Sequence, residues 1–60
     1  MITEDMKQVL EFYNQGLSLY KQREFQKAKD FFEKALKINP NDGPSHLYVE
    51  RCDTFIKTLS

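Results

Sequence analysis

Histidine and cysteine are the side chains that most often carry catalysis or bind metals, and this 60-residue chain has one of each. His46 has Asp42 and Glu50 four residues to either side, within reach on a helix. This spacing favours an ion pair or a solvent-exposed imidazole over a general base or a metal ligand. Cys52 lies among apolar positions, which predicts a buried, inert thiol rather than a reactive nucleophile.

The patterns that mark other catalytic and ligand sites are missing from the sequence. There is no cluster of cysteine and histidine for zinc, and the acidic residues lack the spacing of a calcium loop. Gly16 and Gly43 are isolated, so no glycine-rich phosphate loop is present. We therefore expect no enzyme activity, no metal, no cofactor and no small-molecule substrate.

The balance of charge narrows the classes of partner, and the single cysteine narrows the choice of cellular compartment. Nine basic residues balance nine acidic ones, so no overall field draws the chain to nucleic acid or to an acidic membrane. The net charge is −2 over residues 1–20, +3 over 21–40 and −1 over 41–60, which suits helices with mutually attractive flanks. One cysteine forms no internal disulfide, and no apolar run has signal-peptide or membrane-spanning length. We expect a cytoplasmic protein.

Apolar residues recur with a helical period along the chain, and the strong breaks fall at 22–24 and 39–44. The pattern predicts an all-α fold with helices over residues 3–21, 24–38 and 44–59. Thr3 is the expected N-cap of the first helix. The second must stop before Pro40, because the residue preceding a proline is pushed out of helical space. Pro44 suits the first turn of the third, with Asp42 or Gly43 as its cap.

The apolar faces of these helices differ in width. The first carries an unbroken arc of about 180°, whereas a stripe of about 100° is enough for one buried face. Its apolar surface therefore calls for more than one neighbour, and so does that of the second helix. The third has a narrow stripe that includes Tyr48, Val49, Cys52 and Phe55, as expected of a terminal capping helix.

Small and large residues alternate along the first two helices in a way that is more specific than amphipathicity. Small residues, Gly16 and Ala28, are expected where the two helices cross, and aromatic residues fill the space beside them. The full set of structural positions is Phe12, Gly16, Leu19, Phe25, Ala28, Phe32, Ala35, Leu36 and Pro40. Over residues 9–42 this pattern resembles the tetratricopeptide repeat, a helix-turn-helix unit of 34 residues.

The resemblance implies a single three-helix domain over residues 1–60, with the repeat at 9–42 and a capping helix at 44–59. That helix looks like the first half of another repeat, because the sizes at Phe12, Gly16 and Leu19 recur at Tyr48, Cys52 and Phe55. Some members of the family hold a carboxylate with a clamp of lysine and asparagine. The matching positions here are Tyr13 and Leu17, which hold no carboxylate by charge and imply an apolar partner surface instead.

A second resemblance concerns residues 42–52 together with 16–20 and the helix from Phe25 to Leu36. This combination is similar to a short tail that follows the catalytic domain in some bacterial class III adenylate or guanylate cyclases. It implies a segment for assembly or regulation of a parent cyclase, because 60 residues hold no cyclase domain.

Two functions follow as expectations. The first is a non-catalytic protein-interaction module that self-associates, most simply as a symmetric dimer, through the side of the first helix that extends beyond Phe12, Gly16 and Leu19. The residues predicted to bind the partner are Met6, Leu10, Tyr13, Leu17 and Tyr20. The alternatives are that the third helix covers this stripe within one molecule, or that a groove receives an apolar helix or peptide of a different protein.

Overall fold

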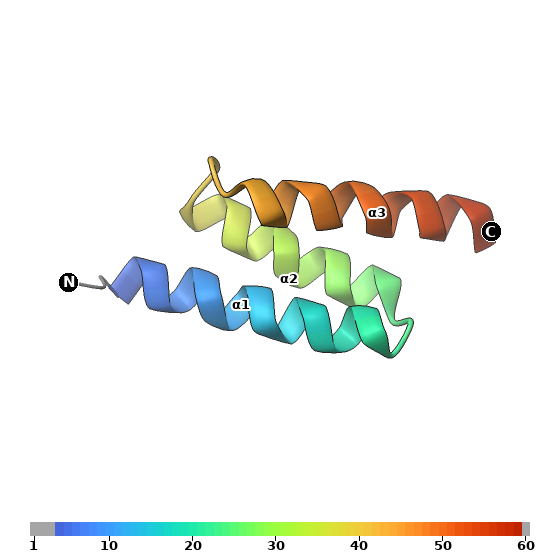
Figure 1. Ribbon diagram of the computed structural model, residues 1–60, viewed down its shortest axis with the longest axis horizontal. Helices are drawn as coiled ribbons and strands as arrows, with labels where there is room; N and C mark the ends of the chain where they lie inside the picture. The colour runs from blue at the N-terminus through green and yellow to red at the C-terminus, as the bar shows by residue number, and fades with distance from the viewer. Residues whose placement is uncertain (1–3, 60) are drawn as a thin grey trace.

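The computed structural model describes residues 4–59, which form three helices: α1 (Glu4–Lys21), α2 (Phe25–Ile38) and α3 (Gly43–Leu59). They lie side by side in chain order, with α2 between α1 and α3 (Figure 1). The Cα atoms fill a slab of 42 × 20 × 13 Å. The predicted all-α fold, a helix hairpin followed by a third helix, is confirmed. Thr3, the predicted N-cap of the first helix, lies outside the described residues.

The core is centred on α2. Ala28, Phe32 and Ala35 of α2 and Cys52 of α3 are fully buried, as is the polar residue Ser45. Among the structural positions predicted from the sequence, the buried ones are Gly16, Ala28, Phe32 and Ala35; the half-buried ones are Phe12, Leu19, Phe25 and Leu36; Pro40 is exposed in the turn after α2. The core is thus small, and much apolar surface lies at its edge.

Gly16 of α1 allows the two helices of the hairpin to approach closely. A Cβ atom added to Gly16 would lie 2.8 Å from Cε1 and Cζ of Phe32, closer than real Cβ contacts allow. The sequence prediction that Gly16 faces Ala28 stays a prediction, and the atoms nearest to Gly16 are those of the Phe32 ring. The small residue on α1 thus makes room for an aromatic ring of α2.

The turn between α1 and α2 reverses the chain through a residue in the left-handed region, Arg23, with φ of 65°. The Glu24 N–H donates to the Leu19 carbonyl at 2.9 Å, and the Arg23 N–H donates to the Tyr20 carbonyl at 3.0 Å. These two bonds are the Schellman pattern, which usually has glycine at the left-handed position. Arginine there carries a steric cost of roughly 1–2 kcal/mol that glycine would avoid.

We expect Arg23→Gly to stabilise the fold. Relief of the left-handed strain exceeds the extra conformational entropy of glycine in the unfolded chain, which leaves a net gain of up to about 1 kcal/mol. Thermal unfolding, followed by circular dichroism, measures this gain in stability. Arg23→Ala is the matched control, because it removes the same side chain and keeps the strain. A melting temperature that rises equally in both variants would contradict this explanation.

The start of α3 is fixed by Asp42. Its carboxylate accepts hydrogen bonds from the Ser45 backbone N–H, at 3.3 Å, and from the Ser45 hydroxyl. The Asp42 carbonyl accepts from the His46 N–H at 3.2 Å. Of the two caps that the sequence allowed, Asp42 is the one used. The same contacts give the buried Ser45 hydroxyl its partner, which a buried polar group needs.

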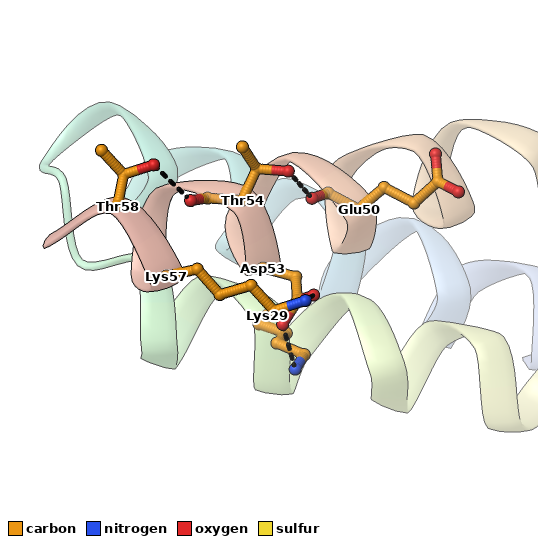
Figure 2. A network of polar contacts seen from close by, with 6 residues as sticks. All are labelled: Lys29, Glu50, Asp53, Thr54, Lys57 and Thr58. Carbon is orange, nitrogen blue, oxygen red and sulfur yellow. Dashed lines mark hydrogen bonds and ion pairs between the residues drawn. The ribbon is translucent and has the colours of Figure 1, made fainter. Parts of the chain in front are cut away.

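An ion pair joins α2 to α3, and another lies within α3. Lys29 of α2 lies 3.4 Å from Asp53 of α3, and Lys57 lies 3.1 Å from the same carboxylate (Figure 2). Hydrogen bonds from Lys57 and then Lys29 lower the pKa of the Asp53 carboxyl. The Lys29–Asp53 pair therefore links α3 to α2, although ion pairs that remain partly exposed add little stability.

Candidate functional site

Aromatic rings from α1 and α3 meet across α2. Tyr20 of α1 contacts Tyr48 and Phe55 of α3, with ring centroids 5.2 and 6.0 Å apart, and Tyr13 lies 5.9 Å from Tyr48. The rings meet edge to face, a favourable arrangement for aromatic pairs. The helices α1 and α3 run in the same direction (Figure 1), and the Tyr48 ring contacts both Tyr13 and Tyr20. We call the surface formed by these rings the α1–α3 face.

The five residues predicted to bind a partner fall into two groups. Tyr13, Leu17 and Tyr20 are half-buried and pack against the core cluster of the same chain. Met6 and Leu10 are exposed, at 58% and 56%. The third helix thus covers part of the predicted partner-binding stripe of α1, as in the alternative of coverage within one molecule. The half of α1 nearer its N-terminus stays open.

That open half borders a groove of about 500 Å³ between α1 and the connection from α2 to α3. Three of the predicted residues, Met6, Leu10 and Tyr13, line it, whereas Leu17 and Tyr20 do not. The lining is mostly apolar and consists of Asp5, Met6, Val9, Leu10 and Tyr13 from α1 together with Ile38, Asn39, Asp42 and Pro44. Its size and apolar character suit side chains of another polypeptide.

The groove has an acidic character although the chain as a whole is neutral. Asp5 and Asp42 line it, and none of its lining residues is basic. The pKa of the Tyr13 hydroxyl is raised, first by desolvation and then by the neighbouring Tyr48 and Asp42. The groove therefore favours positively charged groups beside apolar ones.

Two further apolar residues on α3 are exposed, Leu47 at 48% and Phe55 at 41%. The sequence analysis placed Phe55 in the narrow stripe of α3, and Leu47 lies outside that stripe. Leu47, Arg51 and Phe55 are four residues apart in turn, so they share one side of the helix. This four-residue spacing is the signal in the sequence that could have identified Leu47 and Phe55 as residues of one side of the helix.

His46 and Cys52, the two residues with the most reactive side chains, differ in their exposure. His46 is exposed, and its Nε2 lies at hydrogen-bond distance from the Pro40 carbonyl oxygen. Cys52 is fully buried, as the sequence predicted. Among residues 4–59, no three metal-binding side chains lie close enough to hold an ion.

We expect thiol reagents to modify Cys52 slowly in the native protein. Burial raises the pKa of the thiol more than the nearby Lys29 ammonium lowers it, so little thiolate forms at neutral pH. Modification should be at least about a hundredfold slower than in denaturant, because it waits for unfolding. A colorimetric thiol assay with and without denaturant measures the ratio. Equal rates would place the stripe of α3 on the outside and contradict the observed packing.

Comparison with known proteins agrees with this architecture. The sequence profile of the tetratricopeptide repeat matches residues 9–42, more than half of the chain. The chain belongs to the tetratricopeptide repeat family. The repeat comprises most of α1, the turn at Arg23, α2 and the connection that ends at Asp42. The resemblance drawn from the sequence over the same residues is confirmed, and members of this family are generally non-catalytic modules for protein–protein interaction.

One similar protein is the "adenylate cyclase, terminal-differentiation specific" of Dictyostelium discoideum. It is 39% identical over 51 residues, which cover 85% of this chain but 2% of the cyclase. A cyclase was implied by the second resemblance, whereas the bacterial source and the tail position stay predictions. No solved structure matches the chain significantly. Between residues 4 and 59, no helix has the length and apolar character needed to cross a membrane.

Proposed function

We propose that this repeat is a non-catalytic interaction module that self-associates through the α1–α3 face. The observation that carries the proposal is the exposure of Met6 and Leu10 at the edge of an apolar groove, with Leu47 and Phe55 exposed on α3. Soluble monomers rarely leave large apolar side chains clustered on one surface. Pairing of two copies would remove these side chains from water.

The small core supports a second copy as the partner. Only Ala28, Phe32, Ala35 and Cys52 are fully buried apolar residues in the described part of the chain. A chain of this length hides a smaller fraction of its surface on folding than a larger domain does, and one with so few fully buried side chains gains much from further burial. A twofold interface buries the same surface on both copies and links folding to association.

The experiment is sedimentation of the native chain beside Leu10→Glu. Leu10 is a better position than Leu17, because Leu17 is half-buried within the chain and its replacement would also disturb the fold. Loss of about 1.5 kcal/mol of burial at each of two symmetric positions predicts a dissociation constant raised roughly a hundredfold.

Gln26→Glu is the matched control, because it adds the same charge at an exposed position of α2 and should leave the dissociation constant unchanged. The helical signal in circular dichroism checks that all three proteins are folded. A native chain that stays monomeric up to millimolar concentration would overturn self-association, and so would a Leu10→Glu variant that associates like the native chain.

The second candidate is a groove that binds an apolar helix or peptide of a different protein. The groove itself favours it, since its concave shape admits side chains, whereas a flat surface would not. A monomeric native chain would support this candidate. In either case the partner is a polypeptide, and we expect neither nucleic acid nor a membrane surface as the partner.

The cyclase relative supports a proposal for the biological setting. In a parent nucleotide cyclase, self-association of this module would bring two catalytic domains together or regulate them. The supporting observation is the segment 39% identical to the Dictyostelium cyclase. We also propose a cytoplasmic location, on the balance of charge and the absence of long apolar runs from the sequence.

A further inference from the structure

The groove beside Met6 and Leu10 lies where three helix ends meet (Figure 1). Asp5 is in the first turn of α1, Ile38 is the last residue of α2, and Pro44 is in the first turn of α3. A helix N-terminus carries about half a positive elementary charge and a C-terminus about half a negative one. Two N-termini and one C-terminus therefore leave the backbone with a small positive balance, about +0.5, at this site.

The side chains that line the groove reverse this balance. Asp5 and Asp42 each bring a carboxylate and no lining residue is basic, so the site as a whole carries about −1.5 elementary charges. The Asp42 carboxylate keeps its charge while it caps α3, because both of its hydrogen bonds come from neutral groups of Ser45. Both bonds are accepted by Oδ2, so Oδ1 can accept from a ligand.

Neighbouring groups agree with a negative groove. The pKa of the Tyr13 hydroxyl is raised by desolvation, then by Tyr48 and by the Asp42 carboxylate, so the field of Asp42 reaches the groove lining. The lysines nearest to the lining residues in sequence, Lys7 and Lys37, do not line the groove. Lys37 borders a separate hollow between α2 and α3. A cation of a ligand would thus meet carboxylates in the groove without a lysine of the chain beside it.

We infer that this groove binds a segment of a different protein in which a lysine or arginine lies beside large apolar side chains. The inference rests on the second candidate function and adds the chemistry of the ligand. Met6, Val9 and Leu10 would contact the apolar part of the segment. The Asp5 and Asp42 carboxylates would bind its ammonium or guanidinium group. A second copy placed groove against groove would bring like charges together, which is unfavourable, so the occupant is a different protein.

Two synthetic helical peptides test the charge preference. The first consists of leucine, alanine and lysine, with the lysines beside one stripe of leucines, and the second has glutamate in place of every lysine. Because the chain is neutral overall, a preference between them reports local charge rather than net charge. We expect the lysine peptide to bind at least about tenfold more tightly at low salt, and the difference to shrink as salt is added. Backbone amide NMR shifts measure both affinities, at a chain concentration below that at which the native chain self-associates.

The same spectra and one pair of variants locate the site. The shifts should centre on Val9, Leu10 and Ile38, which line the groove. Asp5→Asn should weaken binding of the lysine peptide about three- to fivefold, because it removes one charge from the groove. Glu4→Gln is the matched control and should change the affinity little, since Glu4 is also an acidic residue of the first turn of α1 but does not line the groove.

Each contrary result overturns a different part of the inference. Equal binding of the two peptides would overturn the charge preference and leave an apolar peptide groove standing. Shifts that centre elsewhere, or Asp5→Asn and Glu4→Gln variants that bind alike, would place the ligand outside the groove. Failure of both peptides to bind at millimolar concentration would overturn the second candidate function as well. Sedimentation of the native chain needs neither peptide, so self-association is judged separately.

Discussion

Phe32→Ala is expected to leave much of the chain unfolded at room temperature. The Phe32 ring is fully buried, stacks on Tyr48 at 5.1 Å and meets the edge of Tyr13 at 5.7 Å. Removing such a ring costs about 3–5 kcal/mol, from lost burial and from the cavity left behind. The whole chain has a free energy of unfolding of about 3–9 kcal/mol by the usual stability per residue. The substitution therefore removes a large share of it.

Phe31→Ala is the matched control for this loss. Phe31 is also an aromatic residue of α2, but it is half-buried and contacts Phe12 at 6.2 Å and the Lys34 ammonium at 4.9 Å. Because part of its ring is already in water, its replacement should cost clearly less. Urea titrations of both variants give the two free energies. Equal losses would mean that Phe32 is not the centre of the core.

Gly16→Ala is the second large effect, and it should destabilise the protein even though alanine is the better helix former. The new methyl group would overlap the Phe32 ring, and neighbouring rings hold Phe32 in place. Overpacking of this kind costs about 1–3 kcal/mol, against a gain of about 0.5–1 kcal/mol from helix propensity. A net loss of about 1 kcal/mol lowers the melting temperature by roughly 4–8 °C in a domain of this size.

A double-mutant cycle with Phe32→Leu separates the overlap from other causes. Leucine lacks the ring that the methyl group would meet, so Gly16→Ala should cost much less in that background. The coupling between the two positions is then the measured quantity. A melting temperature that rises with Gly16→Ala in the native background would show that the helices separate easily, and would contradict the close approach seen here.

The helices of this chain could be predicted from the sequence because local signals mark their ends. Pro40 stops α2, and the caps allowed at Asp42 or Gly43 bracket the start of α3. Cys52 was correctly predicted to be buried, since its apolar neighbours follow the helical period. These features depend on nearby residues alone.

Features that depend on distant residues were predicted less well. The ring nearest to Gly16 belongs to Phe32, which the sequence did not indicate, because the offset between two packed helices does not follow from either helix alone. Tyr13 and Tyr20 were assigned to a partner surface, whereas rings from α3 cover part of them. The strained Arg23 gave no sequence signal either, since glycine is the residue expected at such a position.

The chain-order arrangement of the three helices has a consequence for folding kinetics. Each helix packs on the next one along the chain, so most contacts form between residues close in sequence, and proteins of this kind fold in microseconds to milliseconds. The ring contacts of Tyr13 and Tyr20 with α3 differ, because they join two helices that are not consecutive in the chain. They require all three helices to be in place, so they should form late, and tyrosine fluorescence should then reach its native value after the helical signal does.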